Sequence, residues 1–138
     1  MISISIICSF YKMDKFYKYF LESVVNQIGF KNNIELVICL NKPSKQVVNL
    51  TNKFKTKYKK NIQIIIPKNL TTLGESWNLC LKKSKGKNIA IWNADDQRVQ
   101  NSLLMQENIL NKNKKISFVY GNYFIVKSYN SKNKTIFV

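Results

Sequence analysis

The sequence predicts an α/β protein in which a mostly parallel sheet is flanked by helices. Short apolar runs with strand composition occur at residues 2–8, 34–40, 62–66 and 89–92. Segments with apolar residues at helical spacing lie between these runs. Strands that alternate with helices in this way form parallel sheets joined by crossover helices. No Gly-, Pro- or Ser-rich stretch divides the chain of 138 residues, so we expect one domain over residues 1–138.

The helices in the first half of the chain follow from periodicity. Asp14 can cap a first helix in which apolar residues recur every four positions on the face toward the sheet. These residues are Phe16, Phe20, Val24 and Ile28. The second helix spans about residues 44–58 and is amphipathic, with lysines concentrated at 53–60.

Two more helices are predicted in the second half of the chain. Thr72 and Glu75 have the spacing of a capping box, which predicts a helix start. Four residues of this helix are expected to point toward the core. These are Leu73, Trp77, Cys80 and Leu81. A fourth helix begins near Asn101 and is expected to bury Leu103, Leu104 and either Ile109 or Leu110. Further strands are predicted at residues 116–120 and 123–126.

The chain is strongly basic, with 23 Lys and Arg against 7 Asp and Glu and a formal net charge of +16. Such a charge favours an anionic partner: nucleic acid, acidic lipid or a phosphorylated ligand. The lysines are also spread along the chain among many Asn and Ile, which is the composition that AT-rich coding produces. The run at 53–60, with Phe54 and Tyr58 between its lysines, is a solvated helix face in one interpretation and a nucleic-acid-binding surface in the other.

Several classes of chemistry are excluded by missing residues. The chain has no histidine, which removes Ser-His-Asp, Cys-His and His-metal sites from it. Its three cysteines, Cys8, Cys39 and Cys80, lack zinc-ligand spacing and are expected to be reduced core thiols. No apolar run approaches the roughly 20 residues of a membrane-spanning helix. We therefore expect a cytoplasmic protein, with the inner face of a membrane as a second location.

One adjacent pair of carboxylates, Asp95 and Asp96, directly follows the apolar run at 89–92. Ligands of open α/β sheets bind outside the carboxyl ends of the strands, which is where this pair falls. Two neighbouring carboxylates suit a hard divalent cation that bridges a pyrophosphate, and a simple turn before the next helix is the alternative. No glycine-rich phosphate loop of the G-x-G-x-x-G or G-x-x-x-x-G-K-[ST] type occurs.

From residue 2 to about 126 the chain resembles family 2 glycosyltransferases with the GT-A fold. Five blocks carry the resemblance in the family's order: residues 4–11 (ISIICSFY), 21–27 (LESVVNQ), 35–38 (ELVI), Asn69 with Gly74, Trp77 and Asn78, and 86–96 (GKNIAIWNADD). The resemblance implies a Rossmann-like nucleotide-sugar-binding fold. It also implies transfer of a hexosyl-type sugar from a nucleoside-diphosphate donor to a hydroxyl of a glycan, lipid-linked or protein acceptor, with surface polysaccharide or glycan synthesis as the setting.

The resemblance also implies roles for individual residues. Cys8 and Phe10 would line the nucleobase pocket, Phe10 in place of a tyrosine, and Asn41 would substitute for an acidic residue that contacts the nucleotide. Asn78, Asn93 and Asp96 would lie near the donor sugar and diphosphate. Asp95 would be the principal ligand of a divalent cation, Mn²⁺ or Mg²⁺, in a DxD-like motif.

The chain departs from the family pattern in three respects. Asn93 stands at the first Asp of D-x-D, which removes a negative charge and lowers the expected affinity for a divalent cation. Trp77 and Gln100 replace the usual arginine and proline. The 138 residues end before the family's C-terminal acceptor half, so no general base is assigned. A catalytically silent nucleotide-sugar-binding module is therefore an alternative to an active transferase.

Overall fold

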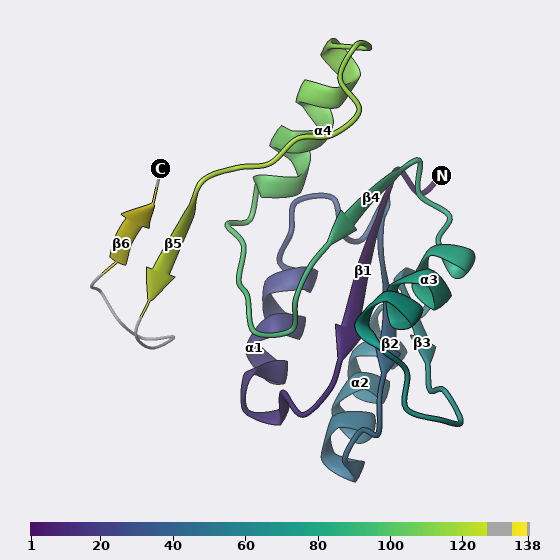
Figure 1. Cartoon of the computed structure of the whole chain (residues 1–138). Coiled ribbons are helices and arrows are strands. Elements are labelled where there is room, and N and C mark those ends of the chain that lie inside the picture. The colour runs from purple at the N-terminus through teal and green to yellow at the C-terminus, as the bar shows by residue number, and fades with distance from the viewer. Residues whose placement is uncertain (127–133, 138) are drawn as a thin grey trace.

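The computed structural model describes residues 1–126 and 134–137 (Figure 1). Its centre is a four-stranded parallel sheet in the order β3-β2-β1-β4. The strands are β1 (Ile4–Phe10), β2 (Ile34–Leu40), β3 (Ile62–Ile65) and β4 (Asn88–Ile91). The prediction of a parallel α/β sheet is confirmed, and the predicted strand ends differ from the observed ones by two residues at most.

Helices cover both faces of this sheet (Figure 1). The helices α1 (Asp14–Val25) and α2 (Lys45–Lys57) lie on one face and α3 (Leu73–Lys83) on the other; a 3₁₀ turn, η1 (Lys59–Asn61), precedes β3. The helix α4 (Ser102–Lys112) extends away from the sheet, and β5 (Tyr123–Val126) pairs antiparallel with β6 (Lys134–Phe137). Residues 116–120 form no strand, so that prediction is wrong.

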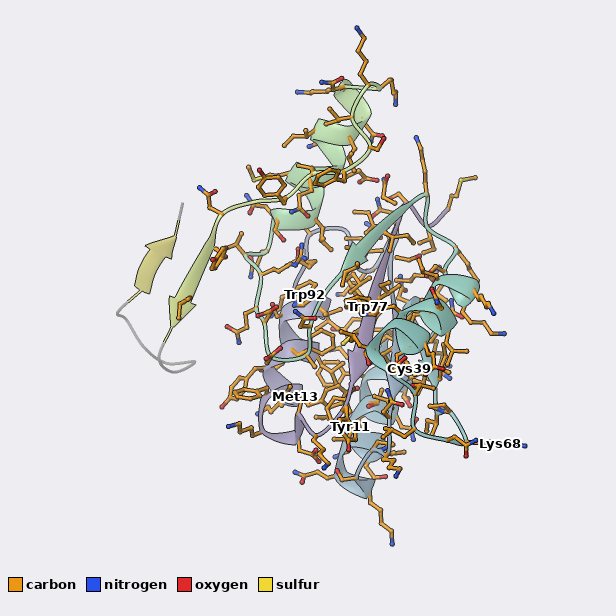
Figure 2. The ribbon with its side chains drawn as sticks, viewed as in Figure 1. Tyr11, Met13, Cys39, Lys68, Trp77 and Trp92 are labelled. Carbon is orange, nitrogen blue, oxygen red and sulfur yellow. The ribbon has the colours of Figure 1, made fainter. Side chains whose placement is uncertain are left out.

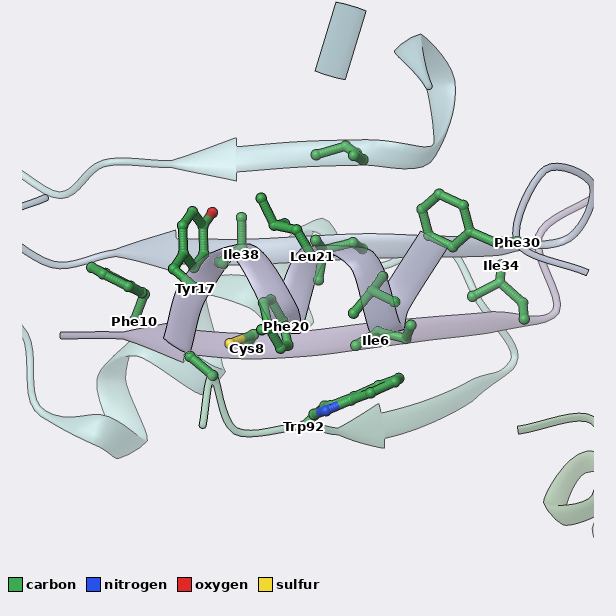
Figure 3. Packing of buried hydrophobic residues seen from close by; sticks show 14 of the residues in the cluster. Ile6, Cys8, Phe10, Tyr17, Phe20, Leu21, Phe30, Ile34, Ile38 and Trp92 are labelled. Atoms are coloured by element: carbon green, nitrogen blue, oxygen red, sulfur yellow. The ribbon is translucent and has the colours of Figure 1, made fainter. Parts of the chain in front are cut away.

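The larger part of the core lies between the sheet and α1. Alternate side chains of β1, namely Ile4, Ile6, Cys8 and Phe10, point toward this helix and are almost fully buried (Figure 3). From α1 the buried residues are Tyr17, Phe20, Leu21 and Val24. Phe16 and Ile28 do not join them. The helix ends at Val25, so Ile28 lies beyond it and is 51% exposed.

On the opposite face α3 contacts the sheet through a narrow stripe. The predicted capping box of Thr72 and Glu75 is present, and Cys80 packs on Ile7, Val37 and Cys39. Leu73 and Leu81 are exposed, contrary to prediction, because Ser76 and Cys80 are the residues of this helix that face the sheet.

The helix α4 buries less than its sequence predicts. Leu103 packs in the main core and Leu110 is half-buried, whereas Leu104 and Ile109 are exposed because the helix projects past the sheet. Within the described part of the chain, no helix combines the length and apolar character needed to cross a membrane. The three cysteines are buried and unpaired, as predicted.

Candidate functional site

The carboxyl ends of three neighbouring strands bring three loops together at one edge of the sheet. In the register of the sheet Phe10 lies beside Leu40, and β4 runs parallel to β1 on its other side. The connections that follow these strands therefore meet at the edge where α/β proteins bind ligands. Figure 2 shows Tyr11 and Met13 at this edge, where the arrow of β1 points.

The connection after β4 is a tight turn that presents two carboxylates. The amide of Asn93 donates to Oδ2 of Asp96 at 3.1 Å, and the backbone N–H of Asp96 donates to the Asn93 carbonyl at 3.2 Å. The indole N–H of Trp92 donates to the Asp96 carbonyl at 3.1 Å. Trp92 and Ala94 are buried, while Asp95 and Asp96 are exposed. The apolar residues thus anchor the turn and the acidic ones face solvent.

The acidic turn lies close to the end of β1. Burial raises the pKa of the Cys8 thiol well above its ordinary value, and the charges of Cys80, Asp95, Cys39 and Asp96 raise it further. The backbone N–H of Trp92, just before the turn, donates to the carbonyl of Ile7, just before Cys8, at 3.1 Å. The fold therefore brings the acidic turn close to Cys8, although Cys8 itself is fully buried.

The oxygen donors at this turn fit a divalent cation that shares its coordination with a ligand. Asp95 and Asp96 supply carboxylates, and Mg²⁺ is commonly bound by one or two carboxylates together with substrate phosphates. In the described residues there is no cluster of three or more His, Cys, Asp or Glu side chains able to hold a metal. Phosphate oxygens from a bound nucleotide would therefore have to complete the coordination.

Arg98 connects the acidic turn to the elements on either side of it. It is the only arginine in the sequence, which is a signal that the sequence analysis missed. Its guanidinium lies 5.0 Å from the centre of the Trp92 ring and donates to the Ile91 carbonyl at 2.9 Å and to Oε1 of Gln106 at 3.2 Å. Burial lowers its pKa, and the charge of Asp96 opposes this shift. The guanidinium thus joins β4, the turn and α4.

Asn41 belongs to a buried hydrogen-bond network at the end of β2. Its amide N–H donates to Oγ of Ser76 at 2.8 Å, and its Oδ1 accepts from the backbone N–H and hydroxyl of Thr71 at 3.0 and 2.6 Å. Its side chain is committed to protein partners and is 1% exposed. In this structure Asn41 fixes the start of α3 against the sheet, and its predicted contact with a nucleotide stays a prediction.

The loop after β1 presents a different aromatic ring from the one predicted. Phe10 is fully buried and packs edge-on against Tyr17, with ring centres 4.7 Å apart. The next residue, Tyr11, is 39% exposed, and the ammonium of Lys12 lies 5.1 Å from the centre of its ring. Tyr11 is the first residue after β1, and the end of the strand at Phe10 is what leaves its ring facing solvent.

The predicted donor-site residue Asn78 is exposed on α3, which covers the other face of the sheet. Its neighbour Trp77 is half-buried against the smaller core cluster. The geometry thus assembles Asn93, Asp95 and Asp96 in one turn, whereas the role of Asn78 stays a prediction.

A parallel sheet that carries an acidic turn, and no glycine-rich phosphate loop, at its ligand edge is the arrangement of the GT-A class of nucleotide-sugar-binding domains. The chain belongs to glycosyl transferase family 2, whose family model matches residues 5–137.

Comparison with known proteins agrees with this assignment. The minor teichoic acid biosynthesis protein GgaA of Bacillus subtilis (strain 168) is 33% identical over 101 residues, which cover 72% of this chain and 23% of GgaA. The S. aureus TarS 1–349 structure in complex with UDP superposes with a TM-score of 0.73 at 20% identity, covering 80% of this chain and 32% of that one.

A second solved structure shows the same fold. The mannosyltransferase PcManGT from Pyrobaculum calidifontis, in complex with GDP-Man and Mn²⁺, has a TM-score of 0.70 at 13% identity, covering 78% of this chain and 32% of that one. The chain thus spans between about a fifth and a third of the length of these relatives.

Proposed function

We propose that this chain is the donor-binding portion of a transferase that moves a sugar from a nucleoside-diphosphate donor to a hydroxyl acceptor. The observation that carries the proposal is the turn at the end of β4, where Asp95 and Asp96 are exposed beside β1. Membership of glycosyl transferase family 2 supports it. So do the ligands named for its structural neighbours, which are UDP, UDP-GlcNAc and GDP-Man.

The reaction forms a bond between the acceptor oxygen and the anomeric carbon of the sugar. The bond from that carbon to the diphosphate breaks, the nucleoside diphosphate leaves with the electron pair, and the hydroxyl proton passes to a base. In this proposal the carboxylates of Asp95 and Asp96 would act on the diphosphate through a bound cation, because carboxylates alone repel it. A divalent cation held by them would neutralise the negative charge that develops on the leaving group.

The exposed ring of Tyr11 is proposed as a wall of the nucleotide site. It stands next to β1 at the ligand edge, and an aromatic face of this kind can stack on a nucleobase. Phe10 and Cys8, both buried behind it, then shape the floor of the site without touching the ligand.

A phosphate-containing cell-surface glycan of the teichoic acid type is proposed as the acceptor. The support is the printed role of GgaA, a minor teichoic acid biosynthesis protein. The net charge of +16 would favour association with such a polyanion. No residue is assigned as the general base. A cytoplasmic location, at the inner face of a membrane or away from it, stays a prediction.

Calorimetry with UDP and GDP, with and without Mn²⁺, tests the donor site. We expect one of the two nucleotides to bind, and Asp95→Ala to weaken its binding about tenfold or more in the presence of Mn²⁺. Glu107→Ala removes a carboxylate on α4 and should leave binding unchanged. The site would be rejected if neither UDP nor GDP bound, or if Asp95→Ala bound the nucleotide as tightly as the wild type does.

The same assays can also indicate either of two other functions. Donor binding without sugar transfer or donor hydrolysis over a broad acceptor panel would indicate a silent nucleotide-sugar-binding module. Salt-sensitive binding of DNA or RNA that survives Asp95→Ala would instead favour a nucleic-acid-binding role for the lysine-rich α2.

A further inference from the structure

Two lysines adopt the same unusual backbone conformation at the ligand edge. Among the residues that the structure describes, Lys12 (φ 53°) and Lys42 (φ 44°) are the non-glycine residues with positive φ. Side chains other than Gly, Asn and Asp rarely occupy this left-handed region, and strained residues of this kind cluster at functional sites.

These lysines occupy equivalent positions in two neighbouring connections. Phe10 pairs with Leu40 in the sheet register, two residues before each lysine. Two residues after each lysine, the hydroxyl of Ser44 donates to Oδ1 of Asp14 at 2.5 Å. The two connections are therefore joined on both sides of the lysines, which places Lys12 and Lys42 at matching positions of adjacent loops.

The charge of the pair is not neutralised by a carboxylate in the described residues, although the Lys12 ammonium lies over the Tyr11 ring. Both lysines are exposed, and within the described residues neither forms an ion pair, the one found there being between Lys18 and Glu22. The neighbouring carboxylate of Asp14 accepts the hydrogen bond from Ser44.

The order of the strands places this lysine pair next to the acidic turn. Along the ligand edge the loop after β2 comes first, then the loop after β1, then the turn after β4. The edge thus carries Lys42, Lys12 and Asp95 in sequence. Two ammonium groups beside a candidate cation site suit the oxygens of a diphosphate, whose charge both can neutralise.

We propose that Lys12 and Lys42 form a two-lysine site for the phosphates of the donor, an inference that rests on the proposed function. The pair would stabilise the departing diphosphate together with a cation held by Asp95, at a turn where Asn93 supplies one carboxylate fewer than D-x-D. A purely structural requirement would favour Gly or Asn at these two positions, because both residues adopt positive φ with less strain than lysine.

The double variant Lys12→Asn/Lys42→Asn separates charge from backbone conformation. Asparagine tolerates the left-handed region, so the variant should melt at the wild-type temperature or above it. If the lysines bind phosphate, calorimetry at low ionic strength should show UDP or GDP binding weakened about tenfold. The corresponding monophosphate should lose less affinity. Lys12→Arg/Lys42→Arg should retain most of the binding.

Lys59→Asn/Lys60→Asn is the matched control. These exposed residues lie in η1, just before β3 and so at the opposite edge of the sheet, and the variant makes the same change in net charge. Equal nucleotide affinity in the wild type and in the double variant at positions 12 and 42 would overturn the two-lysine site alone. An equal loss in the control would also overturn it, by showing a general charge effect. A wild-type chain that binds no nucleotide would reject the proposed function as well.

Discussion

Asn93 donates a hydrogen bond from its side-chain amide to Oδ2 of Asp96, 3.1 Å away. A carboxylate at position 93 has no proton to donate and would repel Asp96 instead. The substitution that lowers the expected affinity for a cation therefore also stabilises the turn in the absence of a cation. Asn93 thus links the stability of the turn to its use of metal.

The variant Asn93→Asp tests this relationship. It should bind Mn²⁺ about tenfold more tightly than the wild type, because a third carboxylate joins Asp95 and Asp96. Without metal it should lose about 1 kcal/mol of stability through the missing hydrogen bond and the added repulsion. Electron paramagnetic resonance of free Mn²⁺ and urea denaturation measure the two effects. Asn111→Asp, on exposed α4, is the control, and equal Mn²⁺ affinity in both variants would contradict the prediction.

The network around Asn41 predicts a loss of stability that does not depend on ligand. Asn41→Ala removes the acceptor of the Thr71 backbone N–H and a donor to the Ser76 hydroxyl at the start of α3, while the 2.7 Å hydrogen bond between the Thr71 and Ser76 hydroxyls remains. Buried polar groups that lose their hydrogen-bond partners should lower the free energy of unfolding by about 1 to 3 kcal/mol in total. Urea denaturation measures this loss. Asn49→Ala, on the exposed side of α2, should change stability little. An Asn41→Ala protein as stable as the wild type would show that water replaces the lost contacts.

Sequence patterns predicted the sheet well because its central strands β1 and β2 are buried on both faces and read as continuous apolar runs. The turn at 93–96 was also predictable, since an acidic pair directly after such a run falls at the ligand edge. The inner and outer faces of the shorter elements were harder to assign. Phe10 and Tyr11 are both aromatic, and the end of β1 at Phe10 decides that Tyr11, the next residue, is the exposed ring.

Sequence patterns could not predict the lysine pair or the contacts of Arg98, for a different reason. The positive φ of Lys12 and Lys42 arises from how two connections pack together, and lysine carries no preference for that conformation. Leu104 and Ile109 follow a helical period that predicts burial, yet α4 extends past the sheet and leaves both exposed. Contacts made between distant segments decided each of these cases.

Alkaline pH should destabilise the protein through its buried thiols. Burial raises the pKa of the Cys80 thiol to about 12 from its ordinary 9.0. Above pH 9 the unfolded chain releases this proton while the folded protein keeps it, so the folded state binds more protons and stability falls as pH rises toward 12.

The variant Cys80→Ala should therefore lose less stability than the wild type between pH 8 and about pH 10. Val37→Ala removes a non-titrating group from the same buried cluster and should keep the wild-type dependence on pH. Urea midpoints at the two pH values compare the three proteins. If the urea midpoint changes between the two pH values by the same amount in Cys80→Ala and in Val37→Ala, the Cys80 thiol does not cause the loss of stability at alkaline pH.

Arg98→Lys should loosen the acidic turn even though it keeps the positive charge. A lysine ammonium lacks the planar fork that lies over the Trp92 ring while donating to both Ile91 and Gln106. We expect a loss of about 1 to 2 kcal/mol of stability. A red shift of tryptophan emission should accompany it as Trp92 becomes more exposed.

The functional readout for Arg98 is nucleotide binding in the presence of Mn²⁺. Arg98 acts through the turn as a positioning residue, so Arg98→Lys should weaken binding several-fold, and less than Asp95→Ala does. Lys112→Arg, the reverse exchange at the exposed end of α4, should leave stability, emission and binding unchanged. If Arg98→Lys keeps wild-type emission and nucleotide affinity, the guanidinium does not hold Asp96 in place, and the turn must be fixed by Trp92 and Asn93 alone.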